Sequence, residues 1–131
     1  MKKTENAAIW LKRAESNLAR AEAGKTDKKI LYEDLCFDCQ QAVEKSLKAL
    51  LVLHDQEPVI THSIGLLLSN IEENIKIDIP DFVNESVILT DYAVQTRYPG
   101  FYEPVTKDEY KTALKFAVQV LNWAKKEIEN K

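Results

Sequence analysis

The chain has 131 residues, of which 45% are hydrophobic and 30% charged, with 18 Lys and Arg against 21 Asp and Glu. This length predicts a single domain over residues 1–131, and the low content of Gly (3) and Pro (4) excludes a disordered or turn-rich β chain. The net charge of −3 excludes a general attraction to nucleic acid or acidic membranes, and no apolar run approaches the roughly 20 residues that span a bilayer.

The hydrophobic periodicity predicts five helices and no strand, and the first two are long. Residues 4–23 form the first helix, because apolar side chains recur at steps of three and four from Ala7 to Ala21. Gly24 is expected to end it. Residues 30–54 carry a broad apolar face and predict a second helix of roughly 35 Å, at about 1.5 Å per residue.

The remaining three helices have start signals of their own. Thr61 or Ser63 is expected to cap a short helix over residues 64–75. Pro80 suits the first turn of the next helix, whose apolar residues spread over more than one stripe and predict burial on two sides. The sequence T-K-D-E from Thr106 is a capping box and starts the last helix.

Short connections between helices of this length favour antiparallel neighbours. The predicted fold is therefore an all-α, antiparallel up-and-down bundle of four long helices plus one short helix. Phe116 and Trp123 lie off the inner stripe of the last helix and are candidates for contact with a partner chain.

Two cysteines, Cys36 and Cys39, share one face of the second helix. Zinc would need two more ligands, and the only histidines are His54 and His62. A redox pair would normally follow a strand, so we interpret both residues as small buried core residues. Together with the missing signal peptide, they indicate a reducing compartment and a cytoplasmic protein.

The sequence Q-Q-A-V-E-K-S-L-K places polar side chains in the middle of the second helix. Gln41, Lys45 and Lys48 align at steps of four and three, and Glu44 pairs with Lys48 at i, i+4. One interpretation is a solvated face with helix-stabilising pairs. The other is a groove of amide and ammonium groups that holds a polar or phosphorylated ligand.

The sequence T-H-S places His62 between two hydroxyl side chains at the start of the third helix. It predicts a capping turn. The alternative is an anion site, because main-chain donors at a helix start favour negative charge and a histidine adds a proton or hydrogen bond.

The sequence T-R-Y-P-G-F-Y-E-P-V-T, residues 96–106, is the one stretch that does not read as helix. Arg97 is expected at the C-terminal end of the fourth helix, where a cation suits the helix dipole, and Tyr98 and Tyr102 follow on a segment stiffened by prolines. A guanidinium held near aromatic rings suits recognition of a phosphate or nucleotide, and it equally suits an ion pair across a protein interface.

Four segments in this order together resemble the HEPN domain, the nucleotide-binding domain of higher eukaryotes and prokaryotes. They are A-x-W-L-K-x-A-E-x-N-L, F-x-x-Q-Q-A-V-E-K-S-L-K-A-L, T-H-S-I-x-x-L-L and D-Y-A-V-x-x-R-Y-P, and they span about residues 7–124. The resemblance implies a bundle of four to five helices that pairs into a dimer. It also implies a minimal nucleotidyltransferase as partner, often in a toxin–antitoxin pair.

Active members of that family resemble metal-independent ribonucleases, with an arginine and a histidine separated by four to six residues. Arg97 matches the arginine, but Tyr102, Glu103 and Pro104 occupy the positions of the histidine. Phenol, with an ordinary pKa near 10, replaces imidazole poorly as a proton shuttle.

The sequence therefore predicts a non-catalytic nucleotide- or RNA-binding and partner-interaction module, with no catalytic residue, metal or cofactor. The alternatives are a ribonuclease toxin with a divergent active site and a purely structural dimeric adaptor. The predicted ligand-binding residues are Arg97, Tyr98, Tyr102, Gln41, Lys45, Lys48 and His62.

Overall fold

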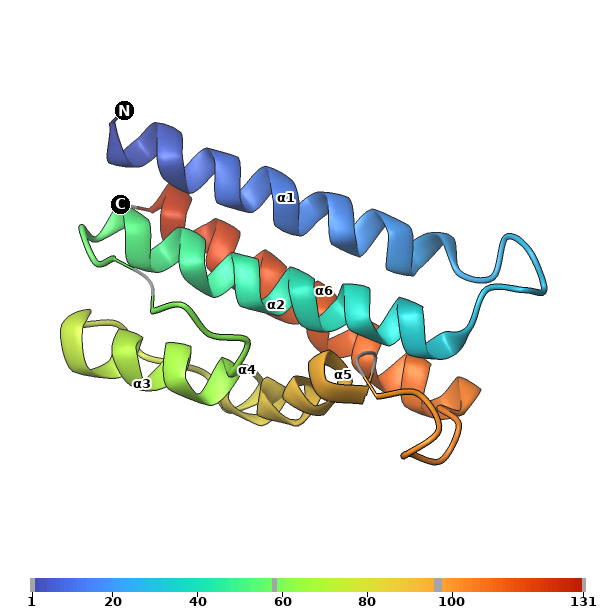
Figure 1. The fold of residues 1–131 in the computed structure, drawn as a ribbon. Coiled ribbons are helices and arrows are strands. Elements are labelled where there is room, and N and C mark those ends of the chain that lie inside the picture. The colour runs from blue at the N-terminus through green and yellow to red at the C-terminus, as the bar shows by residue number, and fades with distance from the viewer. Residues whose placement is uncertain (1, 58, 96–97, 131) are drawn as a thin grey trace.

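The computed structural model describes residues 2–57, 59–95 and 98–130. Over these residues the protein is helical and contains no strand, which confirms the predicted all-α class (Figure 1). The elements are α1 (Lys3–Ala23), α2 (Tyr32–Leu53), α3 (Ile64–Asn74), α4 (Asp81–Glu85), the 3₁₀-helical turn η1 (Ser86–Leu89), α5 (Thr90–Gln95) and α6 (Lys107–Glu129). None of these helices combines the length and hydropathy that crossing a membrane requires.

The long helices α1, α2 and α6 pack against one another, and the short helices α3, α4 and α5 cover the lower side of α2 and α6 in Figure 1. Helix α2 is central, because it contacts α1, α3, η1, α5 and α6. Fifteen of its 22 residues are buried, including polar ones. Side chains on almost every face of α2 therefore need a partner inside the protein.

The helix ends follow the signals in the sequence. Gly24 ends α1 with a φ of 69°, a left-handed value that a side chain disfavours. The Ser63 side chain accepts a hydrogen bond from the Leu66 amide at the start of α3. At the start of α6, Thr106 and Glu109 form the predicted capping box.

The fourth predicted helix is divided into α4, η1 and α5, which follow one another without a gap. The Ser86 hydroxyl donates to the Val83 carbonyl at 2.5 Å, and a serine bonded to its own helix backbone competes with the regular ladder. Val83 and Leu89 are buried, but Val87 and Val94 are each 42% exposed. The prediction that this segment is buried on two sides was therefore wrong. A 3₁₀ turn changes the angular spacing of the residues after it, so the apolar side chains no longer fall on the faces that a continuous α-helix would give them.

The predicted partner contact of Trp123 is also wrong. Trp123 is only 9% exposed and lies in the protein's own hydrophobic core, against which Phe116 is packed and partly buried. An indole spans more of the helix circumference than the stripe of small residues beside it, so it reaches the core from an off-stripe position.

Cys36 and Cys39 are fully buried in the core, as interpreted from the sequence. Burial raises the pKa of the Cys36 thiol to about 12 and also raises the pKa of Cys39. Both thiols therefore stay protonated at neutral pH and act as packing residues.

Candidate functional site

The polar residues in the middle of α2 gather around one buried carboxylate. Glu44 is 3% exposed, and its Oε1 lies 2.9 Å from His62 Nδ1. Gln40 and Gln41 donate to the same oxygen over 3.1 and 3.4 Å, and Lys48 Nζ donates to Oε2 over 2.9 Å. The backbone of His62 belongs to the cluster as well, because its carbonyl accepts a hydrogen bond from Gln40 Nε2 at 3.0 Å.

This cluster keeps Glu44 ionised. Burial alone would raise the pKa of the Glu44 carboxyl, but the hydrogen bonds from Lys48, His62 and Gln40 favour the charged form, so its pKa lies below the ordinary value. Gln41 Nε2 also donates to Gln40 Oε1 at 2.7 Å, so Gln41 and His62 both bond within this cluster.

Lys45 belongs to a neighbouring network between α1 and α2. Its Nζ donates to Asn17 Oδ1 at 2.7 Å, and Asn17 Nδ2 donates to Asp38 Oδ1 at 2.9 Å. Burial lowers the pKa of the Lys45 ammonium; Glu44 opposes that shift, and the positive charge of Arg13 adds to it. Lys45 is therefore a partly buried cation with other cations close by.

A cavity of about 450 Å³ opens between α1 and α2, beside these networks. We call it the α1–α2 cavity, and its lining residues are Ile9, Trp10, Arg13, Glu44, Lys45 and Lys48. Three cations therefore face one carboxylate, and that carboxylate already holds Lys48 and His62. Lys48 Nζ also lies 5.4 Å from the centroid of the Trp10 ring, which is a cation–π distance.

Sequence reasoning placed Lys45 and Lys48 on one face but missed Trp10 and Arg13. These two are one helical turn apart on α1, so their spacing does place them on one face. Nothing in the spacing shows that this face of α1 meets the lysines of α2. Which faces of the two helices meet is decided by tertiary packing.

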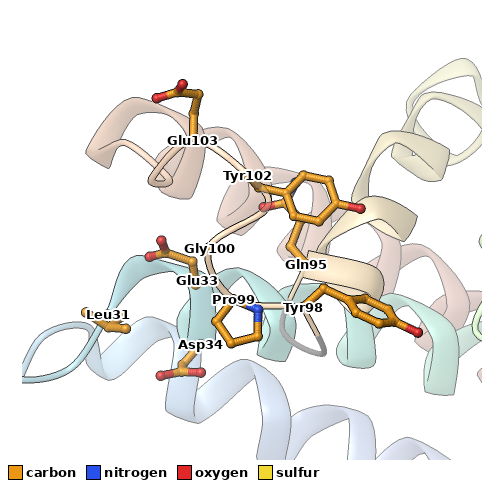
Figure 2. Close-up of a pocket in the computed structure, with 9 residues that line it drawn as sticks. All are labelled: Leu31, Glu33, Asp34, Gln95, Tyr98, Pro99, Gly100, Tyr102 and Glu103. Carbon is orange, nitrogen blue, oxygen red and sulfur yellow. The ribbon is translucent and has the colours of Figure 1, made fainter.

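Tyr98 and Tyr102 lie elsewhere, on a second cavity of about 290 Å³ at the start of α2 (Figure 2). We call it the loop cavity, and its lining residues also include Glu33, Asp34 and Glu103. The tyrosines are 56% and 47% exposed. Among the residues that the structure describes, this cavity is acidic and does not favour phosphate. Arg97, the central predicted residue, lies outside the described residues.

The predicted ligand-binding residues therefore fall into two groups. Gln41, Lys45, Lys48 and His62 surround the middle of α2, whereas Tyr98 and Tyr102 lie near its first turn. Seven residues separate Asp34 from Gln41, which is about 10 Å along a helix axis. Neither the loop cavity nor the α1–α2 cavity is lined by residues of both groups. Over the same residues, no three His, Cys, Asp or Glu side chains are placed to hold a metal ion.

Comparison with known proteins adds family and structural relatives to this geometry. The HEPN domain family matches residues 7–128. The crystal structure of TT1696 from Thermus thermophilus is similar with a TM-score of 0.78 and 32% sequence identity, over 92% of this chain and 96% of that one. The crystal structure of ST0689, an archaeal HEPN homologue, is similar with a TM-score of 0.73 and 30% identity, over 98% of this chain and 99% of that one. No curated protein matches the sequence. The chain belongs to the HEPN domain family.

Proposed function

We propose that this HEPN-domain protein is a non-catalytic module that binds the phosphate of a nucleotide or RNA. In this proposal it is a cytoplasmic homodimer of one-domain chains, and it acts with a minimal nucleotidyltransferase in a toxin–antitoxin-like pair. One observation carries the binding role. Lys45 and Lys48 line the same cavity as Arg13, where positive charge exceeds negative charge in a chain whose net charge is −3.

Both lysines keep donor capacity for a ligand. An ammonium group has three hydrogens, of which Lys45 uses one on Asn17 and Lys48 uses one on Glu44. The anionic Glu44 is already surrounded by donors, so its charge is largely compensated before a ligand arrives. Local excess of positive charge is what a protein of negative net charge needs in order to bind phosphate.

The proposed lack of catalysis rests on the sequence after Arg97. No histidine occurs in the positions where active relatives are expected to have one, and Tyr102, Glu103 and Pro104 stand there instead. A general base for RNA cleavage works best with a pKa near the working pH. Arg97 remains part of the proposal as a phosphate-contacting residue.

Binding measured at several salt concentrations tests the proposal. Purified wild-type protein is expected to bind single-stranded RNA with a negative slope of log affinity against log salt. Lys45→Ala and Arg97→Ala should each reduce the slope by about 0.7, as loss of one phosphate contact predicts. Lys111→Ala, which removes an exposed lysine on α6, is the matched control and should bind as wild type does.

Each outcome of this experiment has a consequence. Failure of the wild type to bind RNA or nucleotide at low salt would refute the binding role. An unchanged slope in Arg97→Ala would remove that residue from the site. If Arg97→Ala instead weakens self-association in sedimentation and no ligand binds either form, the structural adaptor is the better description.

One contact favours ribonuclease activity as a second candidate. His62 Nδ1 lies on the buried Glu44 carboxylate at 2.9 Å, and the His62 side chain is 47% exposed. A carboxylate that orients an imidazole is the arrangement a general base uses. We expect no cleavage of RNA by wild-type protein in excess chelator. Cleavage that disappears in His62→Gln and persists in His54→Gln would establish the ribonuclease instead.

A further inference from the structure

We propose that the α1–α2 cavity is a site for one nucleobase and its phosphate, with the base on Trp10 and the phosphate on Arg13 and Lys45. This proposal rests on the proposed function and names the ligand chemistry of its site. A free mononucleotide and an unstacked nucleotide within a single strand of RNA share this chemistry. The experiment below separates the two.

The dimensions and the lining of the cavity fit such a ligand. Its volume of about 450 Å³ lies in the range of small-molecule sites, roughly 300 to 1,000 Å³. The apolar Ile9 and the indole of Trp10 come from the same helix as Arg13, while the lysines come from α2. The cavity thus combines an aromatic and aliphatic wall with a cationic one, as a flat base joined to an anion requires.

Arg13 is the cation of the α1–α2 cavity for which the described part of the protein provides no hydrogen-bond or ion-pair partner. It is also exposed. Arg20, which lies on the same helix, in contrast forms an ion pair: its Nη2 is 3.4 Å from Asp38 Oδ1. A guanidinium presents a planar fork of donors that matches the oxygens of a phosphate.

An anion at this position would also reduce the electrostatic repulsion between Lys45 and the nearby arginines. Lys45 is partly buried, and its pKa is lowered by burial and by the charges of Arg13 and Arg20, against the opposing effect of Glu44 and Asp38. A bound phosphate between Arg13 and Lys45 would offset the repulsion between these cations.

Trp10 is reachable from two sides. It lines the α1–α2 cavity and also a neighbouring cavity of about 590 Å³, which contains Asn6 and Val52. Within the α1–α2 cavity, the ammonium of Lys48 stands near the indole ring and is itself anchored by Glu44. Glu44 thus holds Lys48 beside the aromatic wall.

Tryptophan fluorescence tests the stacking of the base directly. The chain has 2 Trp, and Trp123 is buried in the core, so the variant Trp123→Phe makes Trp10 the only reporter. Nucleoside monophosphate and single-stranded RNA are titrated separately, with inorganic phosphate and duplex RNA as comparisons. We expect quenching of Trp10 by a ligand with an accessible base, and none by phosphate or by duplex RNA, whose bases are stacked on each other.

The pattern of quenching identifies the source of the ligand. Quenching by the monophosphate supports a free nucleotide, and quenching by single-stranded RNA alone supports an unstacked nucleotide of a strand. If Trp123→Phe unfolds, the difference between wild type and Trp10→Phe isolates the same signal. Circular dichroism confirms that each variant is folded.

The phosphate contact is tested by charge reversal. Arg13→Glu is expected to weaken binding of the quenching ligand at least tenfold. Lys12→Glu makes the same kind of charge change on the adjacent, exposed residue of α1, which does not line the cavity, and should weaken binding far less. Equal effects of the two variants, or RNA binding without any change in Trp10 fluorescence, would overturn the cavity assignment while the proposed function stands. Absence of all binding in the wild type would refute both.

Discussion

Glu44 shows how one residue determines what its neighbours are able to do. Its carboxylate accepts from Gln41 and lies 2.9 Å from His62 Nδ1, and it holds Lys48 beside Trp10. Helical spacing predicts that Glu44 and Lys48 pair. It does not predict that His62, 18 residues further along the chain, completes the same cluster. That contact arises because residues 59–63 run back along α2 before α3 begins (Figure 1).

A stability prediction belongs to this residue. Replacing a buried ionised carboxylate removes charge-assisted hydrogen bonds, so Glu44→Gln should lower the free energy of unfolding by about 2–3 kcal/mol at pH 7. The folded pKa of Glu44 lies below its unfolded value, near 4.5. Its contribution is therefore complete above that value and disappears as the pH falls through the folded pKa.

Urea unfolding of both proteins between pH 7 and pH 3 measures this difference. Glu15→Gln is the control, because Glu15 makes an exposed ion pair of 3.9 Å with Lys125 and should change stability by less than about 0.5 kcal/mol. A constant difference between wild type and Glu44→Gln down to pH 3 would contradict the role given to the ionised carboxylate.

At the scale of an element, helix α6 shows that a short local sequence determines where a helix begins. The Thr106 side chain accepts from the Glu109 amide at 3.1 Å, and the Glu109 carboxylate accepts from the Thr106 amide at 3.3 Å. Both partners are close in sequence, so the start of α6 was predictable. The break of the fourth predicted helix at Ser86 was not, because serine is also common within regular helices.

The capping box gives an element-scale prediction. Thr106→Ala removes the acceptor for an unpaired amide in the first turn and should destabilise the protein by about 1 kcal/mol. Thr112→Ala, an exposed position inside α6, is expected to be neutral or slightly stabilising, because alanine has the higher helix propensity. Thermal unfolding of the two variants and the wild type decides between these outcomes. Equal melting temperatures for both variants would show that the cap contributes nothing.

For the whole molecule, the sequence predicted the all-α fold, but it did not show which of the candidate site residues lie together in space. Periodicity and the signals at Gly24, Ser63 and Thr106 are local, and they were sufficient to place most helices. The α1–α2 cavity depends on which faces of two helices meet, so Trp10 and Arg13 could not be joined to Lys45 from spacing. The same limitation put Trp123 at a partner interface, although the protein buries it in its own core.

The burial of both native thiols has a practical consequence for every experiment on this protein. Alkylating dyes react with thiolates, and Cys36 and Cys39 are shielded and held in the protonated form. A cysteine introduced at the rim of either cavity would then be the one fast-reacting position of the folded chain. Site-selective labels can thus be attached without first removing the native sulfur atoms from the interior.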